Sequence, residues 1–236
     1  MLPLSDHNPR QTVPFVTYSL VVLNIVAFLW ELSLGPNLPR VLYSVAFIPR
    51  NFFMSGDWGH GIFTMFFSMF LHGGLVHIGS NMLYLWIFGD NIEDRLGHVR
   101  YIVFYFACGV IATLAHAFFN PMSSIPAIGA SGAIAGVLGA YLILFPHARV
   151  TTLIPIFFVI AIRQVPAVLI LGLWFVLQLF SGVGSLGVTD AQDVGGVAYF
   201  AHIGGFVAGM LLIVLMGGRS RPRRPPPRPT DYDYWR

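Results

Sequence analysis

Apolar stretches about as long as a bilayer is thick recur along this chain, and they constrain its fold more than any other feature. A helix needs about 20 mostly apolar residues to cross the hydrocarbon core of a membrane. Such spans are predicted at residues 15–34, 71–89, 101–119, 129–146, 166–183 and 197–216. Only 10% of the 236 residues are charged, whereas a soluble domain carries about 25%. The chain is therefore predicted to be an all-α membrane protein with six transmembrane helices.

The remaining segments divide the chain into predicted parts. Residues 1–14 are polar and are expected to form a cytoplasmic N-terminus, followed by a six-span core at 15–216. Within that core, 35–70 is broken by prolines and rich in aromatic residues, so it is expected to be a partly embedded loop at the membrane interface. The apolar piece 151–162 is shorter than the minimum of about 17 residues for a span, and is expected to be interfacial or re-entrant. The basic, proline-rich tail 217–236 is predicted to be disordered and cytoplasmic.

The thirteen basic residues, all of them arginine, test the count of six spans. Cytoplasmic loops of membrane proteins carry an excess of positive residues. If the N-terminus is cytoplasmic and there are six spans, only Arg40 and Arg50 fall outside and the other eleven arginines fall inside. A seventh span at 151–162 would move the arginine-rich tail outside, so six spans with both termini in the cytoplasm are predicted.

Polar side chains at membrane depth are costly, and they often mark functional sites. The second predicted span carries His77 and Asn81, which lie four positions apart and therefore share one helix face. Ser131 lies near the start of the fourth span and His202 near the start of the sixth. Because spans two, four and six all begin on the outer side, these side chains are predicted to lie in one layer just below the outer surface.

A serine and a histidine at one depth are suited to acyl transfer. The hydroxyl of Ser131 is a weak nucleophile unless a base accepts its proton, and the imidazole of His202 can act as that base. The oxyanion that develops during such a reaction needs hydrogen-bond donors. The backbone N–H of Ser131, at a helix N-terminus, and the side chains of His77 and Asn81 can supply them.

Glycines in the fourth and sixth spans favour a close approach of these two helices. Small residues at an interface allow two membrane helices to pack backbone against backbone. The fourth span contains Gly129, Gly132, Gly136 and Gly139, and the sixth contains Gly205 and Gly209. Such packing is what would bring a short serine side chain within hydrogen-bond distance of a histidine.

Each polar residue also has a structural interpretation. Ser131 lies among glycines, where a small residue more often serves helix packing, and His202 could bond to a backbone carbonyl. The polar residues of the second span could simply bridge helices. Asp190 and Asp193 could orient His202 as a third member of the site, although charged residues in a glycine-rich loop are usually solvated. The occurrence of the other residues at one depth favours the functional interpretation.

Four short motifs, in the order in which they occur along the chain, resemble those of a known family. HIGSN at 77–81 matches an H-x-x-x-N pattern, with His72 as a further histidine upstream. The others are EDRLG at 93–97, GASGA at 129–133 and HIGGFVAG at 202–209. Together with the hydropathy of 15–216, they resemble the motifs of the rhomboid family of intramembrane serine proteases.

The resemblance implies a fold, a mechanism and a substrate class. It implies a rhomboid-like bundle of six helices with a partly embedded loop between the first and second spans. Ser131 is expected to be the nucleophile and His202 the general base, in a dyad without a carboxylate, while His77, Asn81 and the Ser131 amide stabilise the oxyanion. Substrates are expected to be single-span membrane proteins, cut near the outer membrane boundary at small residues in a helix-poor site, because an intact helix hides its amides. The expected location is a bacterial plasma membrane.

One position departs from the family pattern. Many bacterial members carry an aromatic residue four positions after the serine, against which the histidine packs, whereas this chain has Ala135. Tyr199 or Phe200 is the suggested replacement support for His202.

Other functions are open to a membrane protein with several histidines. A catalytically inactive relative would bind membrane helices without cutting them. A proton-relay transporter would need intramembrane carboxylates, and Glu31, near an end of the first span, is the only acidic residue inside a predicted span. A metal or haem site could use His72, His77 and His202, but the H-E-x-x-H motif is absent from the sequence. We therefore expect no cofactor, no metal and no nucleic acid, with membrane lipid and substrate proteins as the partners.

Overall fold

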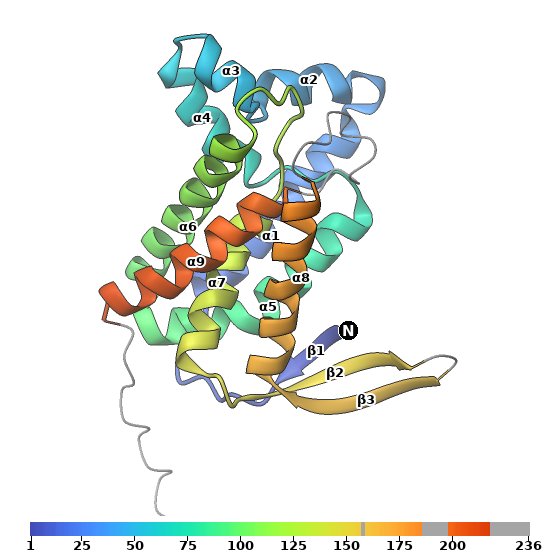
Figure 1. The fold of residues 1–236 in the computed structure, drawn as a ribbon, viewed down its shortest axis with the longest axis vertical. Helices are drawn as coiled ribbons and strands as arrows, with labels where there is room; N and C mark the ends of the chain where they lie inside the picture. Colours follow the sequence, from blue (N-terminus) through green and yellow to red (C-terminus); the bar gives the residue numbers. More distant parts are fainter. Residues whose placement is uncertain (157–158, 186–197, 218–236) are drawn as a thin grey trace, which may run out of the picture.

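The computed structural model describes residues 1–156, 159–185 and 198–217, and its described part is mostly helical. The loop that contains Asp190 and Asp193, and the tail from 218 onward, lie outside the described residues. Long helices occupy the predicted spans (Figure 1): α1 (Phe15–Ser33), α5 (Leu75–Leu96), α6 (His98–Phe119), α7 (Ser131–Leu144), α8 (Ala167–Gly184) and α9 (Tyr199–Leu215).

The helices differ in how well their length suits a membrane. Among the described residues, α1, α6 and α8 are long and apolar enough to cross a bilayer, judged by length and composition. The apolar helices α7 and α9 are shorter, at 14 and 17 residues. The count of six spans therefore remains a prediction.

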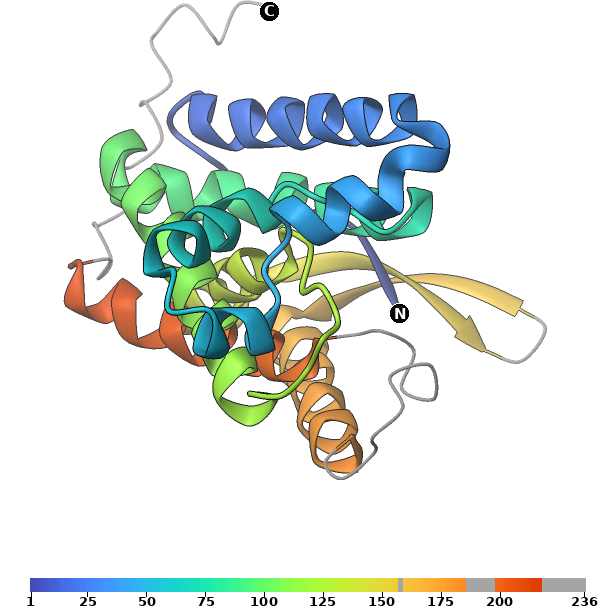
Figure 2. The same cartoon turned by 90° about the horizontal axis from the view of Figure 1, so that it is seen from above.

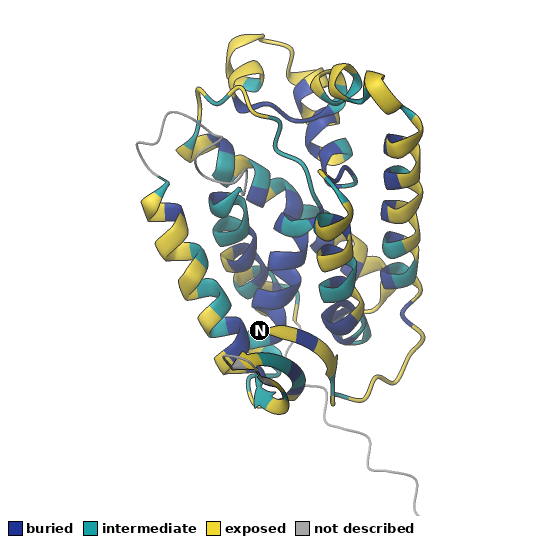
Figure 3. Cartoon of the chain, turned by 90° about the vertical axis from the view of Figure 1, so that its right-hand side faces the viewer, coloured by how far each residue is buried: buried dark blue, intermediate teal, exposed yellow. Residues whose placement is uncertain are grey.

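Helix α7 lies in the middle of the bundle, where it packs against α5, α6, α8 and α9. Helix α1 lies at one edge when the molecule is seen from above, and it contacts α5 and α6 (Figure 2). Buried residues concentrate in the middle of the bundle and exposed ones on the outward faces of the outer helices (Figure 3). Many exposed side chains are apolar, as expected for helices that face lipid.

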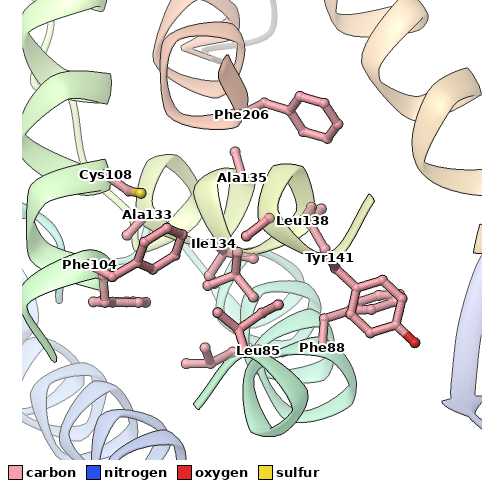
Figure 4. Packing of buried hydrophobic residues seen from close by; sticks show 14 of the residues in the cluster. Leu85, Phe88, Phe104, Cys108, Ala133, Ile134, Ala135, Leu138, Tyr141 and Phe206 are labelled. Carbon is pink, nitrogen blue, oxygen red and sulfur yellow. The ribbon is translucent and has the colours of Figure 1, made fainter. Parts of the chain in front are cut away.

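Helix α7 is enclosed by the core of the bundle. The residues of α7 from Gly132 to Tyr141 are all buried, and they include both small and large side chains. Figure 4 shows Ala133 near Cys108 of α6, Ile134 above Leu85 of α5, and Ala135 directed toward Phe206 of α9. Ser131 is therefore a polar residue at the head of an otherwise apolar, buried helix.

The segment predicted as an embedded loop, 35–70, consists of short helices at one end of the bundle (Figure 1). A 3-10 turn (Gly35–Asn37) leads into α2 (Leu38–Val45), α3 (Pro49–Met54) and α4 (Trp58–Ser68). Prolines stand in the first turn of several of these helices, where no backbone N–H is needed. The interruptions agree with the prediction that the segment does not span; its embedding in lipid remains a prediction.

A small sheet corrects the expectation of an all-α fold. Strands β1 (Leu2–Asp6), β2 (Arg149–Ile156) and β3 (Val159–Pro166) form an antiparallel sheet in the order β1-β2-β3. The described residues of the apolar piece 151–162 thus belong to two paired strands, β2 and β3, which extend sideways from the bundle (Figure 1); its position at the membrane interface remains a prediction. Residues rich in valine, isoleucine and threonine favour strands, and 2–6 supply a third strand from a segment predicted only as polar N-terminus.

The last turn of α5 fixes the beginning of α1. Glu93 is fully buried, and its carboxylate accepts hydrogen bonds from the backbone N–H groups of Val16 and Thr17 at 2.9 and 2.7 Å and from the Thr17 hydroxyl at 2.7 Å. A carboxylate at this position satisfies unpaired amides and complements the positive end of the helix dipole. The neighbouring Asp94 accepts from the backbone N–H of Thr12 at 2.8 Å. This explains in structural terms why the EDRLG turn is acidic.

Candidate active site

Ser131 and His202 meet where α7 and α9 begin. Ser131 is the first residue of α7, and His202 lies in the first turn of α9. Ser131 Oγ and His202 Nε2 are 2.8 Å apart and form a hydrogen bond, although the residues are 71 positions apart in the chain. The structure thus places in direct contact the two side chains that the sequence analysis paired.

Glycine-to-backbone packing brings α7 and α9 this close. A Cβ atom added at Gly205 would collide with the backbone carbonyl of Gly132, and one at Gly209 with the carbonyl of Gly136. A Cβ at Gly139 would collide with the carbonyl of Phe206. The two helices therefore touch through their backbones, and any larger residue at these positions would push Ser131 away from His202.

A second helix holds the other side of the His202 ring. Gln178 of α8 accepts a hydrogen bond from His202 Nδ1 through its amide oxygen, at 2.9 Å. Trp174, one helical turn earlier, lies against the same imidazole with 5.8 Å between ring centroids. With its proton on Nδ1, the imidazole leaves Nε2 as the acceptor for the serine hydroxyl.

The sequence analysis missed both of these residues. The aromatic ring that the described residues place against His202 is Trp174, which corrects the suggestion of Tyr199 or Phe200; Phe200 instead stacks on Phe119, with 4.3 Å between centroids. Gln178 is a polar residue inside a predicted span, so the argument from costly polar groups could have found it. Without the fold, nothing connected it to His202.

His77 lies on the opposite side of the serine, on α5. A Cβ atom added at Gly129 would lie 2.8 Å from His77 Nε2 and 3.5 Å from Ser131 Oγ, so both atoms flank the same point. Gly129 has φ +124°, a conformation that favours glycine. Gly129 therefore lies in the loop before α7, where its backbone passes close to the side chains of His77 and Ser131. This corrects the expectation that it belongs to the contact between the fourth and sixth spans.

Asn81 lies one turn after His77 on the same helix and is only 7% exposed. Among the described residues, its Nδ2 group has no hydrogen-bond partner. A buried amide usually finds one. The Asn81 side chain is therefore a donor that remains available for a bound group.

His72 supports His77 from the turn before α5. Its side chain is buried, and its ring meets that of His77 edge to face, with 5.1 Å between centroids. Its backbone N–H donates to the carboxylate of Glu31 at 3.0 Å, and its Nδ1 bonds to the carbonyl of Phe70 at 3.2 Å. Glu31 is 1% exposed and comes from the end of α1, so the edge helix is tied to the loop that positions His77.

A small cavity of about 30 Å³ opens beside Ser131. Among its lining residues are Ser68, Gly109, Ala112, Thr113, His116, Gly129, Gly132, Ala198 and Ala201. Most of these residues are small, and the volume suits a methyl-sized side chain or a single water molecule.

The arrangement has the parts that acyl transfer needs. A hydroxyl faces an imidazole acceptor, and the free backbone amides of a helix N-terminus lie at the same serine. Asn81 and His77 lie on α5, and a small cavity lined by Ser131 and residues of α6 lies beside the serine. Asp190 and Asp193 lie outside the described residues, and no group of three His, Cys, Asp or Glu side chains within the described ranges could hold a metal ion.

Comparisons with known proteins agree with these observations. Residues 59–219 match the model of the Rhomboid domain. The chain is 29% identical over 201 residues to "Rhomboid protein 1, mitochondrial" of Saccharomyces cerevisiae, an alignment that covers 83% of this chain and 51% of that protein. It is 32% identical over 130 residues to "Rhomboid protease GluP" of Bacillus subtilis, covering 55% of this chain and 24% of that protein.

A plant protein is similar to a comparable degree. The chain is 31% identical over 153 residues to "RHOMBOID-like protein 1" of Arabidopsis thaliana, which covers 65% of this chain and 34% of that protein. The alignments with these three relatives thus span about half of their length or less.

Proposed function

This chain belongs to the rhomboid family, and we propose that it is an intramembrane serine endopeptidase in which Ser131 is the nucleophile and His202 the general base. The observation that carries the proposal is the 2.8 Å contact between Ser131 Oγ and His202 Nε2. Such a hydrogen bond between hydroxyl and base is what an activated serine requires. The chain is an integral membrane protein, so the reaction would take place at membrane depth.

The first half of the reaction transfers the substrate's acyl group to Ser131. As Oγ attacks the scissile carbonyl carbon, its proton passes to His202 Nε2. The carbonyl oxygen becomes an oxyanion, which the Ser131 backbone N–H, Asn81 Nδ2 and His77 Nε2 stabilise. The tetrahedral intermediate collapses, the C–N bond breaks, and the leaving amine takes the proton from His202. An ester between Ser131 and the N-terminal part of the substrate remains.

The second half uses water. His202 Nε2 accepts a proton from a water molecule, the resulting hydroxide attacks the ester carbonyl, and the same donors hold the second oxyanion. When the ester C–O bond breaks, His202 returns its proton to Ser131 Oγ and a carboxylic acid is released. The small cavity beside Ser131 offers one place where such a water molecule fits.

The proposed substrates are single-span membrane proteins with small residues at the cleaved bond. The cavity at Ser131 is too small for a large side chain, which supports this preference. A helix protects its carbonyl groups by hydrogen bonding, so the cleaved segment has to be locally unwound. We further propose six spans, with both termini in the cytoplasm and the active site near the outer face of a bacterial plasma membrane; the arginine distribution supports this orientation.

The decisive experiment compares the wild type with Ser131→Ala on a model single-span substrate in vesicles. Cleavage should disappear while the protein still accumulates in the membrane, because the change removes only a hydroxyl. A fluorophosphonate should label the wild type at Ser131, and His202→Ala should slow this labelling sharply. Undiminished cleavage by Ser131→Ala would refute the assignment, and a wild type that binds the substrate without cutting it would indicate an inactive family member.

A further inference from the structure

Both ring nitrogens of His202 are engaged by neighbouring side chains. Nε2 is 2.8 Å from Ser131 Oγ, and Nδ1 is 2.9 Å from the amide oxygen of Gln178. A neutral imidazole carries one proton on one nitrogen. Because an amide oxygen can only accept, its contact selects the form with the proton on Nδ1, which leaves the lone pair of Nε2 directed at the serine hydroxyl.

The two contacts to the far side of His202 come from one face of α8. Trp174 and Gln178 are four positions apart, so they project from the same side of this helix. Trp174 lies against the imidazole with 36° between the ring planes, and it also packs on Phe206 of α9, with 5.9 Å between centroids. The tryptophan limits where the imidazole can lie, and the glutamine limits how it can rotate about its own axis.

We propose that Gln178 is a positioning residue for the general base His202. This inference rests on the proposed function. Gln178 would hold the Nδ1 proton and the ring orientation, so that Nε2 is always ready to accept the proton of Ser131. It acts through His202 and does not touch the reacting atoms.

The use of an amide at this place has a physical reason. In soluble serine hydrolases a buried carboxylate commonly orients the histidine, but an ionised carboxylate at membrane depth is costly. An amide oxygen supplies the acceptor without a charge. It stabilises the protonated imidazole of the transition state less than a carboxylate would, yet while its oxygen faces Nδ1 it disfavours the unproductive form in which Nε2 carries the proton.

A mere packing role for Gln178 makes a different prediction from a positioning role. Methionine matches glutamine in length and is apolar, so it should serve packing in an apolar setting better than glutamate does. Glutamate retains an oxygen acceptor at nearly the same place, so it should serve positioning better than methionine does. The order of activity of Gln178→Met and Gln178→Glu therefore separates the two roles.

The experiment measures kcat and KM on a model single-span substrate, together with the rate of fluorophosphonate labelling, for the wild type, Gln178→Met and Gln178→Glu. Ser181→Ala is the matched control, because Ser181 is an exposed polar residue on the same helix. We expect Gln178→Met to lower kcat about 10- to 100-fold, because the partly buried hydrogen bond to His202 Nδ1 is lost, with KM and the thermal unfolding temperature little changed. Gln178→Glu should be at least about tenfold faster than Gln178→Met, and Ser181→Ala should match the wild type.

Two results would overturn the proposal: wild-type rates for Gln178→Met, or slower reaction for Gln178→Glu than for Gln178→Met. A failure of Ser131→Ala to abolish cleavage would instead overturn the proposed function, so the two failures are distinguishable. If Gln178→Met does not fold, the ¹⁵N chemical shifts of the His202 ring in the wild-type protein decide the matter. A proton on Nδ1 in the neutral ring supports the proposal, and a proton on Nε2 contradicts it.

Discussion

Helix α9 is held on its two sides by contacts of different kinds. On the side of α7, glycines meet backbone carbonyls, and there is no space for even one added carbon atom. On the side of α8, the contacts to His202 are made by the ends of two long side chains, Trp174 and Gln178. The first contact sets the distance between two backbones, and the second sets the orientation of one ring.

The difference teaches that placing a catalytic pair and aligning it are separate tasks. A backbone contact cannot adjust, so the distance from Ser131 to His202 depends on the smallest residues in the chain. A side-chain contact can adjust, so α8 can change composition at many positions without moving the helices, as the open space around its Gly172 illustrates. The predictions below test this division, from the largest expected effect to the smallest.

Gly205→Ala should have the largest effect on both folding and activity. The new Cβ would meet the carbonyl of Gly132, so α7 and α9 have to separate, and Ser131 moves away from His202. We expect a loss of about 1–3 kcal/mol in the free energy of unfolding and nearly complete loss of cleavage, measured by denaturation in detergent and by substrate turnover. Gly172→Ala on α8 is the control, since its Cβ would have nothing within 4 Å; equal effects of the two changes would argue against the division.

Trp174→Leu should affect the reaction far more than stability. The leucine fills part of the space but no longer presents a flat face to the imidazole, so the ring of His202 samples more orientations. We expect kcat to fall about tenfold, equivalent to about 1.4 kcal/mol in the activation barrier, with a much smaller change in the unfolding temperature. A large drop in stability with unchanged kcat per folded molecule would show that Trp174 acts through helix packing instead.

Gly129→Ala extends the comparison to the part of the site near His77, where a loop makes the close contact in place of a pair of helices. The change adds strain at a positive φ and a close contact with His77 Nε2. Because a loop can shift more easily than a helix pair, we expect stability to fall less than for Gly205→Ala, while fluorophosphonate labelling slows clearly. Labelling at the wild-type rate would show that His77 is not sensitive to this loop.

The smallest effect is expected at the N-terminal strand, which pairs with β2 and is also attached to the helices through the polar side chain of Asp6. Asp6 accepts from the hydroxyl of Tyr141 at 2.7 Å and from Asn91 at 3.0 Å. Burial and the nearby Asp90 raise the pKa of Asp6, against the opposing effect of the Tyr141 hydrogen bond. A raised pKa in the folded state means that this group stabilises docking at low pH, and that the stabilisation is lost as pH rises from the ordinary pKa of Asp6 through its raised one.

Hydrogen exchange of the β1 amides can test this directly. After correction for intrinsic rates, protection of residues 2–6 should be greater near pH 4 than at pH 7, and Asp6→Asn should remove the difference. Cleavage activity should not follow the same pH dependence. Protection that increases with pH would contradict the argument.

Short-range patterns in the sequence predicted some residues of the site and missed others. The spacing of His77 and Asn81 and the small residues around Ser131 are short-range patterns, and they were sufficient to propose the group of residues that the fold gathers. Sequence reasoning could have marked Gln178 as a polar residue in an apolar span, but it could not connect Gln178 to His202 until α8 is placed beside α9. Gly129 was assigned to the wrong contact because a glycine in the sequence does not reveal which neighbour lies where its side chain would be.

The sheet shows the same limit in the fold. The hydropathy of the apolar run at 151–162 did not reveal that it forms strands, and the third strand of the sheet comes from residues 2–6, far away in the sequence. The backbone hydrogen bonds that add β1 to the sheet join segments far apart in the chain.

By itself, the sequence determined that this chain is a mostly helical membrane protein of the rhomboid type, since the lengths of apolar segments and the order of short motifs are local properties that the bilayer and the chemistry impose directly. Only the tertiary structure decided which faces of α7, α8 and α9 meet, and therefore which nitrogen of His202 faces the serine and which side chain holds the other. That choice depends on contacts a few ångströms wide between segments far apart in the chain, and their geometry is set by the packing of the whole bundle.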